Sequence, residues 1–587
     1  MFFAQYKNEI RRSIFSSAFI VVISIIFLVL SIAHPILFRW NNTRNINRRY
    51  GGYYYSGMGV DTISIDGISI GYDNPFYWEI SSLTEEITRI TTSGDYADLS
   101  SSAKELMIKY LNLELDYYRE AAKVATDYMD FRVQIAYSGS NFLNKVFYYE
   151  HFSDPDIEAV AKQRLPIDLA QTAKMTEEER MEELAELSGA LEDCRKIFTS
   201  DTNAAFGSYI KVRRYIEQVS IRDWNKEIDR LAEELIKNPG RSVEIESQIN
   251  GMRTSIEVAE TVNLPEISYR EANKIIPNDG SWQNAALESM VQNQQSFTYT
   301  VPAKEAEYLS SPYMMENFDS YSAYLRSIER QRSGFHELVL IAKASLDAGT
   351  PDMSFDRMGS RAVSFGYASG WIGFAIIFSV MVGSWSVANE FQAGTIRLLL
   401  VRPKTRNKIL AAKYLSALST AIGIFLASCI VNMLVSGIVF GFADFGNPNF
   451  TVTGPASFFS KYFALLAANL AILAMFFNVS FFLSTATKNI AASIVVPIVG
   501  YIGGNILNAY FAYRTINATL KSLMPYMPFM YFNFTGFFET SPYSAIGQMV
   551  SRGIEVSLAK GVTVHLAIAA VALGLSFLIF NKQDITS

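Results

Sequence analysis

Few residues of this chain could do covalent or metal chemistry, and their spacing does not suit it. Of the four histidines, His336 precedes Glu337 but is not followed by a second histidine at the spacing of a zinc protease. Cys194 and Cys429 fall in different predicted regions and are expected to stay unpaired. No G-x-x-x-x-G-K-[ST] segment occurs, so no loop of this type is present to hold the phosphates of ATP. We therefore predict no catalytic residue, no metal site and no ATP hydrolysis by the chain alone.

The residues with the clearest binding potential lie in a short charged loop, 389–413. It holds a single acid, Glu390, and six basic residues: Arg397, Arg402, Lys404, Arg406, Lys408 and Lys413. Basic residues in a short loop between membrane spans mark the cytoplasmic side. From the sequence, Glu390 either caps the incoming helix or pairs with a nearby arginine such as Arg397 or Arg402.

The same loop has the signals of a short helix. Gly394 breaks the incoming helix, Thr395 is placed to cap the segment IRLLLV, and Pro403 ends it. Thr405 is then placed to cap the helix that returns to the membrane. The short helix carries an apolar ridge made of Leu398, Leu399 and Leu400. Two interpretations stay open: a ridge that docks into a groove on a cytoplasmic partner, or a charged turn that only fixes topology.

The elements that position this loop are membrane spans. Six apolar runs are long enough to cross a bilayer: 13–38, 362–389, 414–443, 462–487, 489–513 and 561–580. The first is too long for a signal-peptide core and is expected to be retained. An even number of spans places both termini on one side, and the basic loop predicts that this side is cytoplasmic. The prediction is a multi-pass protein of the cell membrane.

Charge divides the chain into two parts. Residues 39–361 hold 35 basic and 51 acidic residues, whereas the remainder holds 16 basic and 6 acidic ones. An acidic, extracytoplasmic domain, 39–361, is therefore expected between a first part, 1–38, and a five-helix membrane domain, 362–587. The fold class we predict is mainly α, with six transmembrane helices and a large, mostly helical outer domain with minor β structure.

Local patterns predict the elements of the outer domain. The Gly- and Tyr-rich start, 51–75, suits a small strand or hairpin, and 100–136 has apolar residues at helical spacing. Thr176–Glu179 has the capping-box pattern of a helix start, and Ser220 with Asp223 resembles another. Further sheet is expected around 295–301, followed by one or two helices over 303–348.

Two features of the membrane part bear on transport. The outer segment 514–560 is rich in Phe, Tyr, Met and Pro, and suits short helices dipping into the outer leaflet or an interfacial aromatic belt. No span carries Asp, Glu, Lys or Arg in its interior, which argues against an ion-coupled carrier. Asparagines in the spans either line a path or bridge helices through hydrogen bonds: Asn432, Asn469, Asn478, Asn505 and Asn508.

The loop resembles that of type-2 ABC transporter permeases, in which a Glu ends the second span and a Gly-Thr pair follows. The residues that carry the resemblance are Glu390, Gly394–Thr395, Arg402–Pro403 and Lys413. Six spans and a broken outer segment before the last one are also similar, and the likeness covers 1–38 and 362–587. It implies that 395–401 is a coupling helix that contacts a separate ATPase subunit. It further implies two ATPase copies, which bind ATP and Mg, and a second permease, identical or related.

The function expected from these features is that of the membrane subunit of an ABC exporter for an amphipathic or lipid-like substrate, such as a peptide or antimicrobial. Its partners would be the ATPase, the second permease and membrane lipid, with no nucleic acid. The alternative is a membrane sensor whose outer helical domain binds a ligand. A sensor is expected to continue into a cytoplasmic signalling domain, whereas this chain continues into four more apolar runs.

Overall fold

The computed structural model describes residues 18–49, 62–65, 68–92, 96–165, 167, 169–172, 175–395, 405–513, 518–538 and 544–582. The chain divides into two compact units. We call Met1–Trp40 with Ala285–Ser587 the membrane unit, and Asn41–Asn284 the inserted unit. The membrane unit therefore includes residues 285–361, which the sequence had placed in the outer domain.

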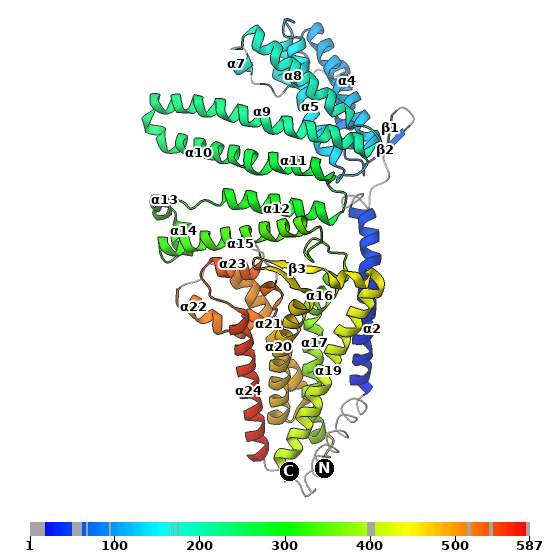
Figure 1. Ribbon diagram of the computed structural model, residues 1–587, viewed down its shortest axis with the longest axis vertical. Helices are drawn as coiled ribbons and strands as arrows, with labels where there is room; N and C mark the ends of the chain where they lie inside the picture. The colour runs from blue at the N-terminus through cyan, green and yellow to red at the C-terminus, as the bar shows by residue number, and fades with distance from the viewer. Residues whose placement is uncertain are drawn as a thin grey trace. The chain divides into compact units, whose positions relative to one another are not determined.

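Six helices of the described chain are long and apolar enough to cross a membrane. They are α2 (Ala18–Arg49), α17 (Ile372–Gln392), α19 (Arg406–Phe440), α20 (Phe458–Thr487), α21 (Ile490–Tyr513) and α24 (Leu558–Lys582) (Figure 1). Little sheet accompanies them. The prediction of a mainly α, multi-pass membrane protein is confirmed.

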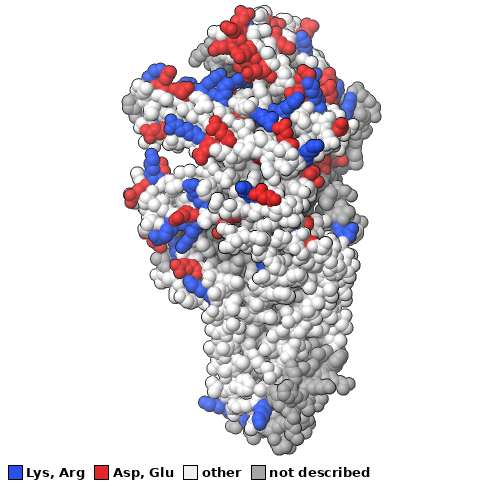
Figure 2. Space-filling model, viewed as in Figure 1, with Lys and Arg blue, Asp and Glu red and all other residues white. Residues whose placement is uncertain are grey.

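The helices alternate in direction, which defines two ends of the bundle. We call the end that holds Glu390, Arg406, Lys488 and Lys582 the loop end, and the opposite end the hairpin end. In Figure 2 the visible face of the helices is white over most of its length, with Lys and Arg at the lower end. A long uncharged band bounded by charge is what a lipid-facing surface requires.

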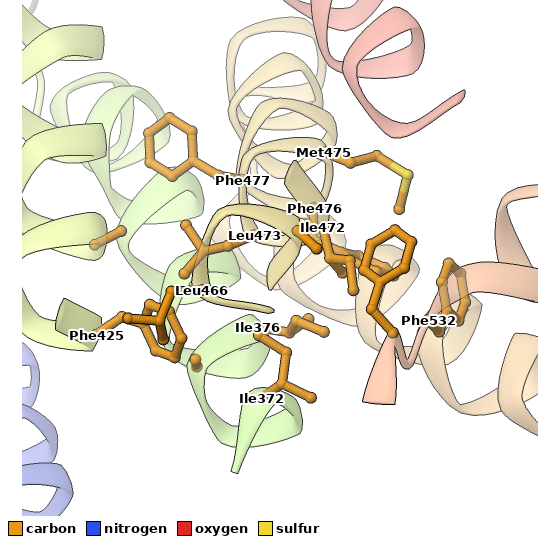
Figure 3. Packing of buried hydrophobic residues seen from close by; sticks show 14 of the residues in the cluster. Ile372, Ile376, Phe425, Leu466, Ile472, Leu473, Met475, Phe476, Phe477 and Phe532 are labelled. Atoms are coloured by element: carbon orange, nitrogen blue, oxygen red, sulfur yellow. The ribbon is translucent and has the colours of Figure 1, made fainter. Parts of the chain in front are cut away.

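Helix α20 lies at the centre of the bundle. Of the residues in its span 72% are buried, and of those in α17 61%, against 17% in α21. Apolar side chains of α17, α19 and α20 pack together with Phe532 from a later segment (Figure 3). The arrangement makes α17 and α20 the inner pair, on which the other helices pack.

Small residues allow α17 and α20 to approach closely. A Cβ atom on Gly383 of α17 would lie 2.9 Å from the Phe477 carbonyl oxygen of α20. Ser384 and Ser480 lie 2.5 Å apart through their hydroxyl oxygens, and the Ser484 hydroxyl donates to the Ser384 carbonyl at 2.7 Å. Without a hydrophobic driving force in lipid, such close packing and hydrogen bonds hold helices together. These contacts hold α17 and α20 closely against each other.

The segment after α21 forms short helices that fold back onto the bundle. They are α22 (Ala518–Leu523), η5 (Met524–Tyr526), η6 (Pro528–Tyr531), η7 (Thr535–Phe537) and α23 (Ala545–Ser551). Phe532 is buried, with ring centroids 5.1 Å from Phe476 and 5.7 Å from Tyr501. Gly504 leaves the space that the Phe532 ring occupies. The short helices expected from the prolines are therefore present, and Gly504 serves packing within the chain.

A buried ion pair organises the hairpin end. There α16 (Ser360–Gly370) meets η4 (Phe442–Gly446) and the hairpin of β3 (Pro448–Thr451) and β4 (Gly454–Ser457). The Arg361 side chain is 1% exposed; its Nε lies 2.8 Å from Asp444 Oδ1, and it donates to the carbonyls of Pro351 and Pro448 at 2.7 and 2.8 Å. Burial raises the pKa of the nearby Asp356 carboxyl above its usual value, and the Asp444 carboxylate adds to that rise.

The described chain before α16 has the helices α12 (Trp282–Tyr299), which begins just before the unit boundary, and α13 (Glu305–Ser310), α14 (Pro312–Asn317) and α15 (Tyr321–Ala348). The sheet predicted around 295–301 is wrong, because α12 continues to Tyr299. Phe297 has high β propensity, but its ring packs beneath the Arg332 guanidinium of α15 at 4.3 Å. Packing against a neighbouring helix therefore overrides local propensity. The helices expected over 303–348 are present.

The inserted unit contains, after the end of α2, the antiparallel hairpin of β1 (Thr62–Ile65) and β2 (Ile68–Gly71), in which Ile63 pairs with Ile70. Its helices are α3 (Tyr77–Thr92), α4 (Ser101–Val124), α5 (Phe131–Glu150), α6 (Ile157–Gln163), α7 (Leu169–Thr172), α8 (Glu177–Lys196), α9 (Thr202–Lys237), α10 (Ser242–Val258) and α11 (Leu264–Asn273). The predicted hairpin and helices are confirmed.

The two predicted capping boxes have different outcomes. Thr176 and Glu179 form the reciprocal bonds of a capping box at the start of α8. The second box is wrong, because Ser220 and Asp223 lie inside α9, a continuous helix of 36 residues. A Ser-x-x-Asp pattern can also sit in a helix interior when tertiary packing continues the helix through it.

Candidate coupling site

The loop end of α17 closes in a way that the sequence partly predicts. The Ala393 amide donates to the Asn389 carbonyl at 2.9 Å, and the Gly394 amide to the Phe391 carbonyl at 3.2 Å. Gly394 then adopts a left-handed conformation with φ of 69°. Glycine is favoured there because it has no Cβ atom to clash, and the turn redirects the chain at Thr395. The predicted helix break at Gly394 is thus seen.

A buried ion pair joins the loop ends of α17 and α19. Lys413 Nζ lies 2.9 Å from Glu390 Oε1, and the two side chains are only 6% and 14% exposed. The Thr395 hydroxyl donates to the other carboxylate oxygen of Glu390. We call Glu390, Thr395 and Lys413 the loop-end cluster. It fixes the end of one membrane helix to the start of the next.

The cluster shows a partner of Glu390 that the sequence analysis did not consider. Glu390 pairs with Lys413, which is 23 residues away. Arg397 and Arg402 lie outside the described residues. The signal available in the sequence was weak: one acid and one lysine flank a loop, with no spacing rule to join them. Their contact depends on how α17 packs against α19.

The remaining predicted loop residues lie outside the part of the chain that the structure describes. These are Leu398, Leu399, Leu400, Arg402 and Pro403. Thr395 is described, and its hydroxyl is used by Glu390. The coupling helix therefore stays a prediction, whereas the residues that flank it in the chain, Thr395 and Thr405, are described.

The return into the membrane begins at Thr405, as expected, with α19 starting at Arg406. Thr405 occupies the N-cap position of α19, but its side chain does not make the capping hydrogen bond that the sequence predicts. Arg406 donates to the Asn581 carbonyl of α24 at 3.3 Å. Lys488, in the turn between α20 and α21, lies 5.0 Å from the centroid of the Phe391 ring of α17. The loop end is thus connected across several helices.

Two of the predicted path asparagines bridge helices. Asn432 of α19 donates to the Ser31 carbonyl of α2 at 3.0 Å, and Asn469 of α20 donates to the Ala368 carbonyl of α16 at 2.8 Å. Both side chains are buried. Inside a bilayer no water is present to bond a buried amide, so a hydrogen bond to a neighbouring helix satisfies it. Asn432 and Asn469 therefore bridge helices, which is one of the two roles that the sequence allowed.

The other three asparagines are placed differently. Asn478 and Asn505 each donate to the carbonyl four residues earlier in their own helix, at 2.7 and 2.9 Å. The side-chain oxygens of Asn478 and Asn508, like that of Asn432, are buried without a hydrogen-bond partner among the described residues. A buried acceptor without a partner could accept a hydrogen bond from a substrate, and the path role stays a prediction for all five asparagines.

The cysteines are buried in different units. Cys194 and Cys429 are both free thiols. Burial raises the pKa of Cys194 to about 12, so its thiol stays protonated at neutral pH and reacts slowly. Within the described residues, no group of three or more His, Cys, Asp or Glu side chains is placed to hold a metal ion.

Fold and site together define a multi-pass α-helical membrane protein with a charged loop end. A family model described as "Protein of unknown function (DUF2705)" matches residues 351–586, from just before α16 to the end of α24. The "Uncharacterized protein YhcI" of Bacillus subtilis (strain 168) is 38% identical over 65 residues. That similarity covers 11% of this chain and 21% of the length of that protein.

Proposed function

We propose that this chain is the membrane subunit of an ATP-driven ABC exporter, and that the loop-end cluster transmits force from a separate ATPase. The single observation that carries the proposal is the buried ion pair between Glu390 and Lys413. An ATPase that pushes on 396–404 would act on a segment attached at both ends: Thr395 bonds to Glu390, and Lys413 belongs to the helix that follows.

The packing supports a route from the loop into the bundle. A force applied at Glu390 would move α17, and the contacts of Gly383, Ser384 and Ser484 would carry α20 with it. Because α20 is the most buried of the candidate spans, its tilt would rearrange the helices around it. The proposal is that this tilt alternates the bundle between inward-open and outward-open states.

The substrate we propose is amphipathic or lipid-like. The predicted spans carry no Asp, Glu, Lys or Arg in their interiors that would bind a coupling ion, so we propose that the energy comes from the partner. The orientation we propose places the loop end in the cytoplasm, because the described basic residues Arg406, Lys408, Lys488 and Lys582 gather there. The inserted unit would then be extracytoplasmic.

The experiment is affinity purification of the tagged chain from its native membranes in a mild detergent, followed by mass spectrometry. The proposal expects a protein with a phosphate-binding loop at one copy per copy of this chain. Recovery of a signalling kinase or response protein in place of an ATPase would favour the sensor alternative and contradict the proposal.

A further inference from the structure

A basic pocket opens on the membrane unit at the hairpin end of α24. It has a volume of about 410 Å³ and lies between α15 and the segment that runs from α22 to the start of α24. In Figure 2, Lys and Arg side chains gather with some Asp and Glu over α14, α15 and α22. The pocket is distinct from the loop-end cluster, because none of its lining residues belongs to α17 or α19.

The charge of this pocket is positive. Its lining has two acids, Asp319 and Glu555, and five basic residues: Arg326, Arg330, Lys521, Arg552 and Lys560. The resulting net charge is +3, counted from those side chains. Asp319 pairs with Lys521 at 3.8 Å and Glu555 pairs with Lys560 at 3.4 Å, so the net positive charge corresponds to the three arginines of the lining. An anion entering the pocket therefore meets an excess of positive charge.

Two arginines are available to a ligand. Arg326 and Arg330 are four residues apart on α15, so they project from one face of the helix. Arg326 makes no hydrogen bond or ion pair to any described residue. Arg330 donates one bond, from Nη1 to the Val550 carbonyl at 3.0 Å, which orients its guanidinium and leaves other N–H groups unused. Planar guanidinium groups match the paired oxygens of a phosphate.

The lysines place the pocket at the membrane boundary. Lys560 is the third residue of α24, and beyond it the helix continues as an apolar span. Lys521 donates to the Asn317 carbonyl at 2.9 Å, so α22 is held against α14 beside it. A phosphate in this pocket would thus lie just outside the hydrocarbon layer, at the depth of lipid headgroups.

Exposed apolar side chains lie next to these charges. Tyr526 lines the pocket and is 65% exposed, and Leu523 in the preceding turn is 49% exposed. A free inorganic anion gains nothing from such neighbours, whereas an acyl chain does. From this juxtaposition we propose that the pocket binds the phosphate headgroup of an anionic membrane lipid, with Arg326 and Arg330 as the main ligands. Binding needs no ATPase, so the inference does not rest on the proposed function.

The test uses the full chain in dodecylmaltoside, with lipid bound per protein counted by native mass spectrometry. Dioleoylphosphatidylglycerol is titrated against dioleoylphosphatidylcholine and against inorganic phosphate. The variant is Arg326→Glu, since Arg326 is exposed and makes no hydrogen bond or ion pair with a described residue that folding would lose. The control is Lys343→Glu, the same reversal at an exposed position of α15 outside the pocket.

The expected result is saturable binding of phosphatidylglycerol that is about tenfold weaker in Arg326→Glu. Lys343→Glu should bind as the unchanged protein does, and phosphatidylcholine should bind at least several times more weakly. Equal binding by Arg326→Glu and the unchanged protein would overturn the proposal, since the lipid would then be a nonspecific shell. Competition by inorganic phosphate at the same concentration would also overturn it, because the site would then read phosphate alone.

Discussion

Replacing Lys413 by methionine tests whether the loop-end cluster holds the bundle together. Methionine keeps most of the side-chain volume and forms helices well, so the main change is the loss of one charge. The Glu390 carboxylate, only 14% exposed, would lose its ammonium partner at 2.9 Å. Removing one partner of a buried pair costs about 3–5 kcal/mol, whereas an exposed pair contributes about 0–1 kcal/mol. With side chains only 6% and 14% exposed, Lys413 and Glu390 form a buried pair, so the larger cost applies.

The assay is thermal unfolding of the purified chain in detergent, followed by near-ultraviolet circular dichroism. Lys413→Met should lower the melting temperature by several degrees. The double variant Glu390→Gln with Lys413→Met should recover most of that loss, because no charge stays buried. Lys408→Met is the matched control: the same change in the same helix, at an exposed residue that makes no ion pair with any described residue. Equal melting of both lysine variants would refute the reasoning.

Three other predictions concern packing, orientation and pH. Gly383→Ala should lower the melting temperature, because its Cβ would meet a backbone oxygen at 2.9 Å, whereas Gly423→Ala, with open space around it, should not. A cysteine at the exposed position Glu182 should react with an impermeant maleimide added outside intact cells. A cysteine at the exposed position Lys582 should react only after the membrane is permeabilised, and the opposite pattern would overturn the proposed orientation. Because the pKa of Asp356 is raised in the folded state, its ionisation removes stability as pH rises from about 4 through that pKa. Asp356→Asn should therefore raise the melting temperature at pH 7 and change it little below pH 4, and a larger gain at the acidic end would contradict the sign.

The membrane spans follow from the sequence because hydrocarbon imposes a strict rule. A helix that crosses lipid needs a long apolar run, so runs such as 462–487 predict α20 within a few residues. The hairpin at 62–71 and the cap at Thr176 are also local, since all the residues that form them are neighbours in the chain.

Contacts between distant residues could not be predicted in this way. Glu390 and Lys413 meet because α17 and α19 pack side by side, and no local pattern specifies that distance. Phe532 was expected in an outer segment, yet its burial against Phe476 depends on the space that Gly504 leaves. The division of the chain before Ala285 likewise depends on which helices pack together. The sequence boundary at 361 marks a different feature, the start of the apolar run 362–389.

The rate of ATP hydrolysis by affinity-purified material tests the central claim most directly. The chain purified alone should hydrolyse no ATP, and the complex from native membranes should hydrolyse it. Leu398→Asp or Leu399→Asp would place a charge in a desolvated groove of the ATPase, at a cost of about 2–4 kcal/mol in binding free energy. Either variant should lose the ATPase on purification, or keep it and lose the stimulation of ATP hydrolysis by substrate. Arg402→Ala, a change at the rim, should have a smaller effect. Hydrolysis by the isolated chain, or full activity in complexes carrying either Leu→Asp change, would contradict the account.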